Sequence, residues 1–255
     1  MKKSNQEETR QHNSRLVLST IYLSGEISRV EIARRTQLTR TTVSEIVAIF
    51  MKSGLVIEAG QAPSSGGKPA TLLQVDKNAR LILGIDLAER EFCGALVNLR
   101  GEIRQRICIP VKASNGENAL YLVYTLIEQL LQLANQPVIG IGIGVPGLMD
   151  PATGSVHQAV NLDWHDLPLG DLLNQQFNLP IHLANDCQVA ALGEFTFGEN
   201  ENIQNLILIQ AGRGVGAGVV LNGRLFYGDK SGAGEIGHIR VSENGELCRC
   251  GNLGC

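Results

Sequence analysis

The chain has 255 residues, of which 44% are hydrophobic and 4% aromatic, and it contains 29 glycines. This composition excludes an intrinsically disordered chain and is typical of α/β proteins, in which aliphatic strands alternate with glycine turns. The net charge of −3 is divided unevenly, because residues 1–75 carry 10 Lys and Arg against 6 Asp and Glu, whereas residues 76–255 carry 12 against 19. A basic first segment is compatible with nucleic-acid contact.

The sequence shows neither a secretory signal nor a membrane span. Its N-terminus is polar, and no apolar run reaches the roughly 20 residues that a span needs. We therefore expect a cytoplasmic protein without membrane insertion. In that compartment, cysteines that lie close together in sequence are more often metal ligands than disulfides.

The first two predicted helices follow each other closely. Residues 13–24 place apolar side chains at helical spacing and predict one helix. Ser28, with Glu31 three residues later, has the pattern of a capping box. This pattern predicts a second helix over residues 29–36.

A third helix and a hairpin complete the first domain. Thr39 is the N-cap candidate for a helix that continues to Gly54. Two helices joined by a short turn are typical of a helix-turn-helix. The short strands LVIEAG and ATLLQV then flank a Gly/Ser/Pro/Lys segment, residues 61–69, and predict a β-hairpin wing. Residues 1–75 are therefore predicted to be a winged helix-turn-helix.

Small polar side chains occupy the start of the predicted recognition helix. They can approach base edges and phosphates of operator DNA, and the arginine can make a bidentate contact: Arg40, Thr41, Thr42 and Ser44. Lys68 in the wing is positioned for a phosphate or the minor groove. The alternative is an ordinary three-helix bundle with a solvated face, but the wing after the helix pair favours DNA binding.

Residues 81–255 have a different sequence pattern, which predicts strands, helices and glycine turns in mixed order. Strands are predicted at residues 81–88, 92–103, 106–111, 138–145, 181–184, 205–210 and 217–221, with a tight turn at Arg100-Gly101. Helices are predicted at residues 115–134, 171–177 and 186–197, the last with Asn185 as its cap. The fold class of this domain is therefore expected to be α/β.

A cluster of soft metal ligands lies at the end of the sequence: His238, Cys248, Cys250 and Cys255. A Cys₃His set suits tetrahedral zinc, and because all four positions are filled the zinc should be structural. The alternative is a set of free thiols. None of the remaining cysteines looks like a ligand: Cys93, Cys108 and Cys187.

The segment GAGEIGHI (residues 232–239), followed by CRCGNLGC (residues 248–255), resembles the signature of the ROK family (repressor, open reading frame, kinase). The resemblance implies an actin/hexokinase-like, ribonuclease H-like sensor domain behind a winged helix-turn-helix. It further implies a sugar-responsive transcriptional repressor, a homodimer that binds operator DNA and a sugar or sugar-phosphate effector. Some repressors of this family also bind a transport-system protein.

The same resemblance implies site residues in this chain. Glu235 matches the family's sugar-hydroxyl acceptor, and His238 matches a residue that both ligates zinc and faces the sugar. Asn185 and Asp186, in ANDCQVAALGE, match an Asn-Asp pair whose Asp is the general base in the kinases. Two further matches extend this ligand site: Gly147, in the loop that closes over the sugar, and the weaker Asn161.

The chain departs from the kinases of the family at the phosphate loop. Those kinases have Asp-x-Gly-Gly-Thr there, whereas Asp86 is followed by LAER, in which Glu89 would repel a triphosphate. The glycine-rich segment 212–218 is retained. We expect ligand binding without turnover and no enzyme activity. The alternatives are an ATP-dependent sugar kinase and a degenerate regulator that no longer senses ligand.

The family resemblance also implies a shortened sensor domain. The sequence ends at Cys255, whereas family members continue with a further sugar-contacting Glu and with helices that complete the second lobe and the dimer contact. We therefore expect a domain that is truncated at its C-terminal end.

Overall fold

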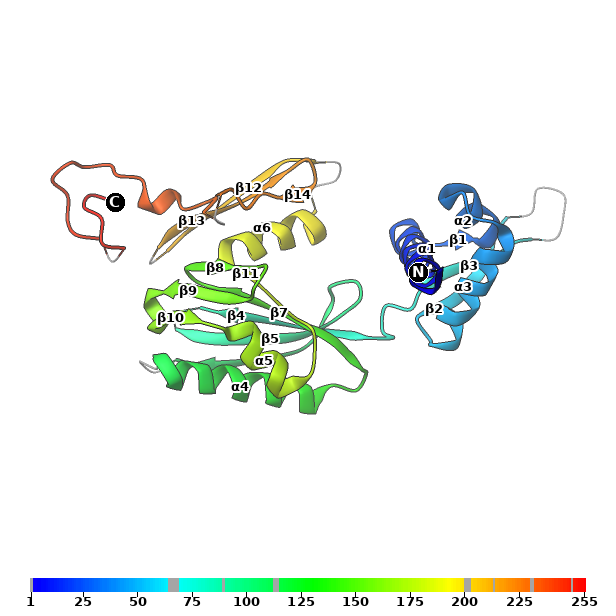
Figure 1. Ribbon diagram of the computed structural model, residues 1–255, viewed down its shortest axis with the longest axis horizontal. Helices are drawn as coiled ribbons and strands as arrows, with labels where there is room; N and C mark the ends of the chain where they lie inside the picture. The colour runs from blue at the N-terminus through cyan, green and yellow to red at the C-terminus, as the bar shows by residue number, and fades with distance from the viewer. Residues whose placement is uncertain are drawn as a thin grey trace. The chain divides into compact units, whose positions relative to one another are not determined.

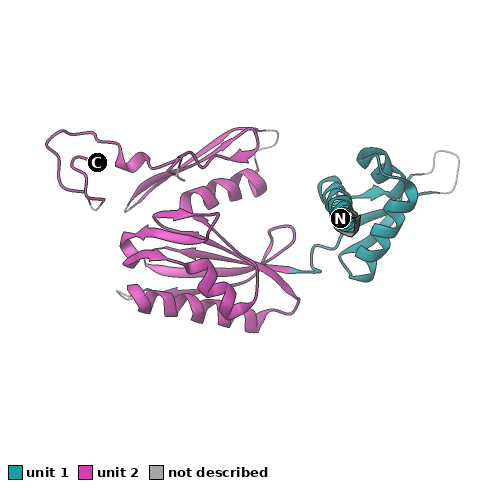
Figure 2. Cartoon of the chain, viewed as in Figure 1, with its two compact units in different colours: residues 1–80 teal, residues 81–255 magenta. Residues whose placement is uncertain are grey.

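The computed structural model describes residues 2–63, 69–88, 90–111, 115–199, 203–212, 214–229, 232–248 and 250–255. The chain divides into two compact units, residues 1–80 and residues 81–255 (Figure 2). No described helix is long and apolar enough to cross a membrane.

The first unit combines three helices with a small antiparallel sheet of order β1-β3-β2 (Figure 1). Its elements are α1 (Lys2–Ser24), β1 (Ile27–Ser28), α2 (Arg29–Thr36), α3 (Arg40–Lys52), β2 (Val56–Gln61) and β3 (Thr71–Val75). Aliphatic side chains from all three helices and the sheet are completely buried: Val17, Ile21, Ile32, Val43, Val47 and Leu73. The predicted hairpin is present as the antiparallel pair of β2 and β3.

Local capping explains where α2 and α3 begin. The backbone N–H of Glu31 donates to Ser28 Oγ at 3.3 Å, and the backbone N–H of Thr42 donates to Thr39 Oγ1 at 3.2 Å. Both predicted caps are confirmed. The Glu31 carboxylate accepts hydrogen bonds from the arginines one turn later in α2. These hydrogen bonds lower the pKa of Glu31 to about 2.

The predicted start of the first helix, residue 13, is wrong, because α1 begins at Lys2. The added turns are polar and therefore show no apolar periodicity. They are rich in Lys, Gln, Glu and Arg, which are good helix formers, so the helix extends without an apolar face.

The second unit is built on a five-stranded mixed sheet of order β11-β7-β4-β5-β6 (Figure 1). Its strands are β4 (Leu81–Leu87), β5 (Glu91–Asn98), β6 (Ile103–Pro110), β7 (Val138–Val145) and β11 (Ile181–Asn185). β4, β5 and β6 form an antiparallel meander, whereas β7 is parallel to both β4 and β11. The expected mixed α/β class is confirmed for this unit.

Helix α4 (Gly116–Leu133) covers one face of that sheet. Its apolar stripe is completely buried: Ala119, Val123, Leu126, Ile127 and Leu130. The sheet residues beneath it alternate, so that Phe92 and Leu96 of β5 are buried while their neighbours point to the other face. One face of the sheet is therefore core, and the other remains available for a site.

Three short strands that the sequence analysis left unassigned follow β7. They are β8 (Leu148–Asp150), β9 (Ser155–Ala159) and β10 (Trp164–Leu167), and the 3₁₀ turn η1 (Val160–Leu162) joins the last two. Trp164 is buried, and its Nε1 donates to the carbonyl of Gly116 at 2.9 Å. Helix α5 (Leu169–Phe177) then leads to β11.

Helix α6 (Asp186–Phe197) contacts β7 and β11 on one side and the next sheet on the other (Figure 1). That sheet consists of β12 (Leu206–Ala211), β13 (Val215–Leu221) and β14 (Arg224–Leu225). A Cβ at Gly218 would collide with the carbonyl oxygen of Cys187, so glycine permits backbone-close packing of α6 on β13. The turn η3 (Ile236–His238) and a largely irregular segment end the chain.

Candidate functional site

The centre of the candidate ligand site is the junction of β11 and α6. Asn185 is the N-cap of α6, and its Oδ1 accepts from the backbone N–H groups of Cys187 at 3.0 Å and Gln188 at 3.3 Å. Its Nδ2 donates to the carbonyl of Gly147 at 3.2 Å. The structure therefore brings Asn185, Asp186 and Gly147 together, at the carboxyl ends of the parallel strands β7 and β11. Crevices outside this end of parallel strands are where open α/β sheets bind ligands.

Gly147 requires glycine for two reasons. Its φ of +97° is unfavourable for any residue with a Cβ. A Cβ there would also collide with the carbonyl oxygen of Gln158 and lie 3.1 Å from the Cα of Ala159. The loop after β7 is therefore held against β9. Asn161 follows in η1 with an exposed side chain, two residues beyond Ala159.

Asp86 is a carboxylate that the sequence analysis noted only as a remnant of the phosphate loop. It lies opposite Gly144 at the carboxyl end of β4, and Gly144 in turn abuts Asp186. Partial desolvation raises the pKa of Asp86, and the charge of Asp186 raises it further, while the guanidinium of Arg106 opposes both. The carboxylates of Asp86 and Asp186 therefore lie close together, because β4, β7 and β11 end at the same edge of the sheet.

Glu235 approaches the same junction from the far end of the chain. A backbone hydrogen bond from Ala217 to Gly234, at 2.8 Å, holds its segment against β13. Burial raises the pKa of the Cys187 thiol to about 12, with further contributions from the charges of Asp186 and Glu235. Glu235 is therefore within electrostatic range of the start of α6. Its Oε2 lies 3.7 Å from His238 Nε2.

The four predicted zinc ligands converge. Their ligand atoms all lie within 4.8 Å of one another: His238, Cys248, Cys250 and Cys255. The sulfurs of Cys250 and Cys255 are 3.8 Å apart, and Cys248 Sγ is 3.7 Å from His238 Nδ1. The edge of a tetrahedron with Zn–S bonds of about 2.3 Å is about 3.8 Å, so the spacing fits zinc.

The pKa values of two thiols in this cluster are shifted in opposite directions. A hydrogen bond from the backbone N–H of Asn252, the largest cause, holds the pKa of Cys250 below its ordinary value. Desolvation and the neighbouring thiols raise the pKa of Cys255 to about 11. Crowded thiols resist ionising together, and a bound cation would relieve that repulsion.

The candidate DNA-contacting residues lie at the start of α3. Arg40, Thr41 and Ser44 are exposed, and Thr42 is half-buried with its Oγ1 2.9 Å from Thr39 Oγ1. Lys68, the candidate wing contact, lies outside the described residues. The exposed set occupies the first turn and a half of the helix, where recognition helices read bases.

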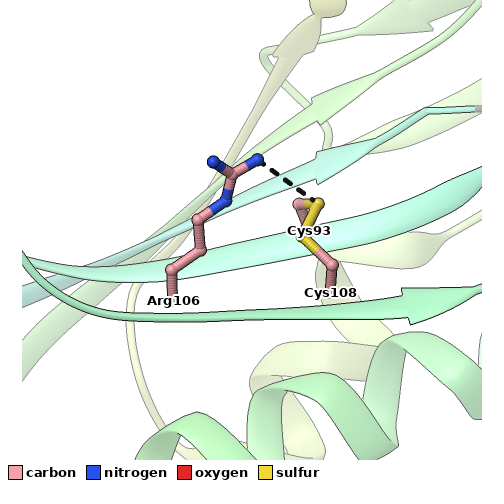
Figure 3. Close-up of a disulfide and its surroundings, with 3 residues drawn as sticks. All are labelled: Cys93, Arg106 and Cys108. Atoms are coloured by element: carbon pink, nitrogen blue, oxygen red, sulfur yellow. Dashed lines mark hydrogen bonds between the residues drawn. A yellow bond between two sulfur atoms is a disulfide. The ribbon is translucent and has the colours of Figure 1, made fainter.

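A disulfide between Cys93 and Cys108 is a feature that the sequence analysis missed (Figure 3). The distance of each cysteine from the predicted turn could have indicated this pairing. The predicted turn at Arg100-Gly101 places each cysteine seven residues from the turn, so a regular hairpin puts them opposite each other. The observed register pairs them in this way.

A mixed sheet that delivers an Asn-Asp pair to the carboxyl edge of its parallel strands, with α6 leading into a second sheet, defines an actin- and hexokinase-like α/β domain. Residues 82–255 match the ROK family, and the chain belongs to this family.

Two relatives illustrate the similarity. The chain is 38% identical over 250 residues to the xylose repressor of Caldicellulosiruptor bescii, covering 96% of this chain and 63% of the relative. It is 30% identical over 249 residues to the DNA-binding transcriptional dual regulator NagC of Escherichia coli K12, covering 96% and 61%. The chain thus spans about three fifths of the length of these relatives.

Solved structures include both regulators and kinases. A ROK family transcriptional regulator, a homologue of the E. coli MLC protein, superposes with a TM-score of 0.81 at 29% identity, over 97% of this chain and 63% of that one. A ROK family glucokinase from Streptomyces griseus, in complex with glucose and AMPPNP, superposes with a TM-score of 0.64 at 31% identity, over 69% and 55%.

Proposed function

We propose that the chain is a DNA-binding transcription regulator, a repressor of carbohydrate genes that responds to a sugar or sugar phosphate in the cytoplasm. The main support for this proposal is the share of the chain that each solved structure matches. The ROK regulator matches 97% of the chain and so includes the first unit, whereas the glucokinase matches 69%, about the share that the second unit makes up.

The first unit acts as a winged helix-turn-helix. The helices α2 and α3 form the pair, and the hairpin of β2 and β3 forms the wing. The α3 N-terminus enters the major groove, where Arg40 makes a bidentate contact and Thr41 and Ser44 approach bases or phosphates. Two-fold operators mirror dimeric proteins of this class, so the working form is a homodimer. A transport-system protein is a candidate second partner.

The second unit senses the ligand. Carboxylate and amide groups recognise vicinal hydroxyls because they accept and donate hydrogen bonds in fixed directions. Asn185, Asp186 and Glu235 provide these groups, and the Gly147 loop is hydrogen-bonded to Asn185. The ligand exerts control when it binds two conformations of the unit unequally and so shifts their populations.

Phosphoryl transfer is disfavoured by the residues after Asp86. Phosphate loops need backbone N–H groups exposed by glycine, but Ala88 stands at the first glycine position of the Asp-x-Gly-Gly-Thr pattern and places an exposed side chain there. Glu89 lies outside the described residues. Catalysis of this kind depends on positioning and charge neutralisation, so binding without turnover is the expected outcome.

Zinc is the proposed cofactor of the second unit. His238, Cys248, Cys250 and Cys255 would hold it, with His238 binding through Nδ1 and its Nε2 directed to Glu235. A zinc with four protein ligands cross-links its segment and leaves no position for a reacting water. The zinc cluster would thereby hold the side chain of Glu235 in position to accept a hydrogen bond from the ligand.

Zinc binding is tested by metal analysis of the purified chain and of two variants. Cys250→Ser is expected to lose the metal and to lower the melting temperature, because closed sites contribute folding free energy. Cys187→Ser is the control outside the cluster and should keep one zinc per chain. Equal metal content in the wild type and Cys250→Ser contradicts the proposal.

The regulator function is tested by fluorescence anisotropy with DNA from the chain's own promoter region. The titration is repeated with xylose, N-acetylglucosamine and their phosphates. Specific binding that one of these compounds changes supports the proposal. Transfer of phosphate from ATP to one of these sugars, without specific DNA binding, would instead favour a kinase.

Variants of α3 locate the DNA interface. Arg40→Ala should weaken specific binding about 5- to 150-fold, the equivalent of about 1–3 kcal/mol for a bidentate base contact. Lys52→Ala, at the opposite end of α3, is the charge-matched control and should change affinity less than about 2-fold. Equal effects of the two variants contradict the assignment of the α3 N-terminus.

A further inference from the structure

Cys93 and Cys108 lie directly opposite each other on β5 and β6, with their Cα atoms 4.1 Å apart (Figure 3). This separation is closest to the non-hydrogen-bonded spacing of an antiparallel pair, about 4.5 Å, at which side chains are nearest. Neither cysteine belongs to the Cys₃His cluster or to the candidate ligand residues. A redox role for this pair can therefore be tested separately from the functions proposed above.

The pair is accessible from solvent. Cys93 alternates with the buried Phe92 of β5 and so points away from α4, and both cysteines are half-buried. β6 is the edge strand of its sheet, so no further strand of that sheet lies on the side of the disulfide away from β5. A partly exposed disulfide at a sheet edge is more easily reduced than one in a core.

Two charged groups flank the sulfurs. Arg106 Nη2 donates to Cys93 Sγ at 3.7 Å, and a carboxylate oxygen of Glu91 lies within 4.8 Å of both sulfurs. A guanidinium stabilises a neighbouring thiolate, which is the attacking species in thiol–disulfide exchange. The Glu91 carboxylate opposes ionisation of both thiols, whereas Arg106 contacts Cys93, so Cys93 is the cysteine prepared to attack.

We propose that Cys93 and Cys108 are a reversible redox-modification site that exchanges with small disulfides such as oxidised glutathione. The Cys93 thiolate attacks one sulfur of oxidised glutathione, forming a mixed disulfide and releasing one glutathione thiolate. Cys108 then attacks Cys93 Sγ, which forms the Cys93–Cys108 bond and releases the second glutathione. The two cysteine protons end on the two glutathiones, so two thiols are oxidised and one small disulfide is reduced.

The oxidation state of the two cysteines changes how firmly the end of β6 is held to β5. In the oxidised form the bond ties the last third of β6 to β5, whereas in the reduced form backbone hydrogen bonds and side-chain packing alone hold this end. Asp86 faces Cys93 across β4 and β5 in register, so the pair lies in the same cross-strand row as a carboxylate of the candidate ligand site. Amide exchange at residues 107–109 is therefore expected to slow on oxidation.

The full-length chain is equilibrated in glutathione buffers that run from reduced to oxidised, then acid-quenched, alkylated with N-ethylmaleimide and digested with trypsin. The cleavage sites separate the two cysteines into EFCGALVNLR (residues 91–100) and ICIPVK (residues 107–112). Both peptides are expected to be alkylated in excess reduced glutathione. They should be joined as one cross-linked species in excess oxidised glutathione, and dithiothreitol should reverse this.

Two results would overturn the proposal. A pair that stays cross-linked throughout the series is a structural disulfide, and a pair that stays alkylated throughout is not a redox site. Cys93→Ser, with folding checked by circular dichroism, should leave Cys108 able to form only a mixed disulfide with glutathione. An intramolecular cross-link of Cys108 in that variant also overturns the assignment.

The role of Arg106 is tested by the rate of oxidation. Arg106→Gln should oxidise roughly 3- to 10-fold more slowly than the wild type at neutral pH, because less thiolate is available. Arg104→Gln, earlier on the same strand and paired with Glu102 at 3.2 Å, is the control and should react at the wild-type rate. Equal rates in the two variants contradict the activation of Cys93 by Arg106.

Discussion

Replacing Gly147 by alanine tests whether the loop after β7 holds the candidate ligand site in place. The residue has φ of +97°, and its Cβ would meet the carbonyl oxygen of Gln158 and the Cα of Ala159. Its own carbonyl accepts the 3.2 Å hydrogen bond from Asn185 Nδ2. The substitution therefore disturbs the backbone, β9 and the α6 cap together.

The expected magnitude follows from these contacts. A positive φ costs a non-glycine residue about 1–2 kcal/mol. A shift of the loop away from β9 lengthens the bond to Asn185, and a neutral hydrogen bond contributes about 0.5–1.5 kcal/mol. Gly147→Ala should therefore lower the free energy of unfolding by about 1.5–3.5 kcal/mol, with residual crowding against β9 adding to the loss.

Urea unfolding followed by tryptophan fluorescence measures this loss. The chain has one tryptophan, Trp164, which is buried in the second unit at 3% exposure and so reports that unit. The control is Gly142→Ala on β7, where a Cβ meets no atom within 4 Å, and it should be neutral or stabilising by up to about 1 kcal/mol. A loss below about 0.5 kcal/mol for Gly147→Ala, or equal losses in both variants, refutes the reasoning.

Three further predictions concern other parts of the chain. The carboxyl of Glu31 should titrate with a pKa of about 2 in carbon-detected NMR, because two arginines of α2 donate to it; its stabilisation is then complete above pH 4.5 and is lost as the pH falls through about 2. The Cys187 thiol, whose pKa burial raises to about 12, should resist iodoacetamide at pH 8 in the native chain and react in urea; native labelling would contradict its burial. Gly218→Ala should lower the free energy of unfolding by about 1–3 kcal/mol through overpacking against α6, whereas Gly193→Ala, which has open space, should not; no difference would argue against close packing.

Features set by neighbouring residues could be predicted from the sequence. The caps at Ser28, Thr39 and Asn185 depend on a side chain and a backbone N–H two or three residues later, so a local pattern is sufficient. The long strands and α4 were also predicted, because their apolar periodicity is regular. The resemblance to the ROK family rests likewise on short contiguous motifs.

Features set by distant residues could not be predicted in the same way. Each of β8, β9 and β10 has at most five residues, too few for periodicity to separate a strand from a loop. The proximity of Asp86 to Asp186 requires the strand order β11-β7-β4, which no local pattern contains. The pairing of Cys93 with Cys108 was accessible in principle, but only through the register of a complete hairpin.

The close packing of α6 on β13 has a mechanical consequence. A Cβ at Gly216 would lie 2.7 Å from Cys187 Sγ, and one at Gly218 would collide with the Cys187 backbone. Because so little space separates them, α6 and the hairpin of β12 and β13 cannot slide past each other. They therefore move as one rigid body. A tilt imposed at Asn185, where the helix begins, would therefore move β13 as far as the turn at Asn222 that leads to β14. That turn is six residues beyond Gly216, which is about 20 Å along a strand at about 3.3 Å per residue.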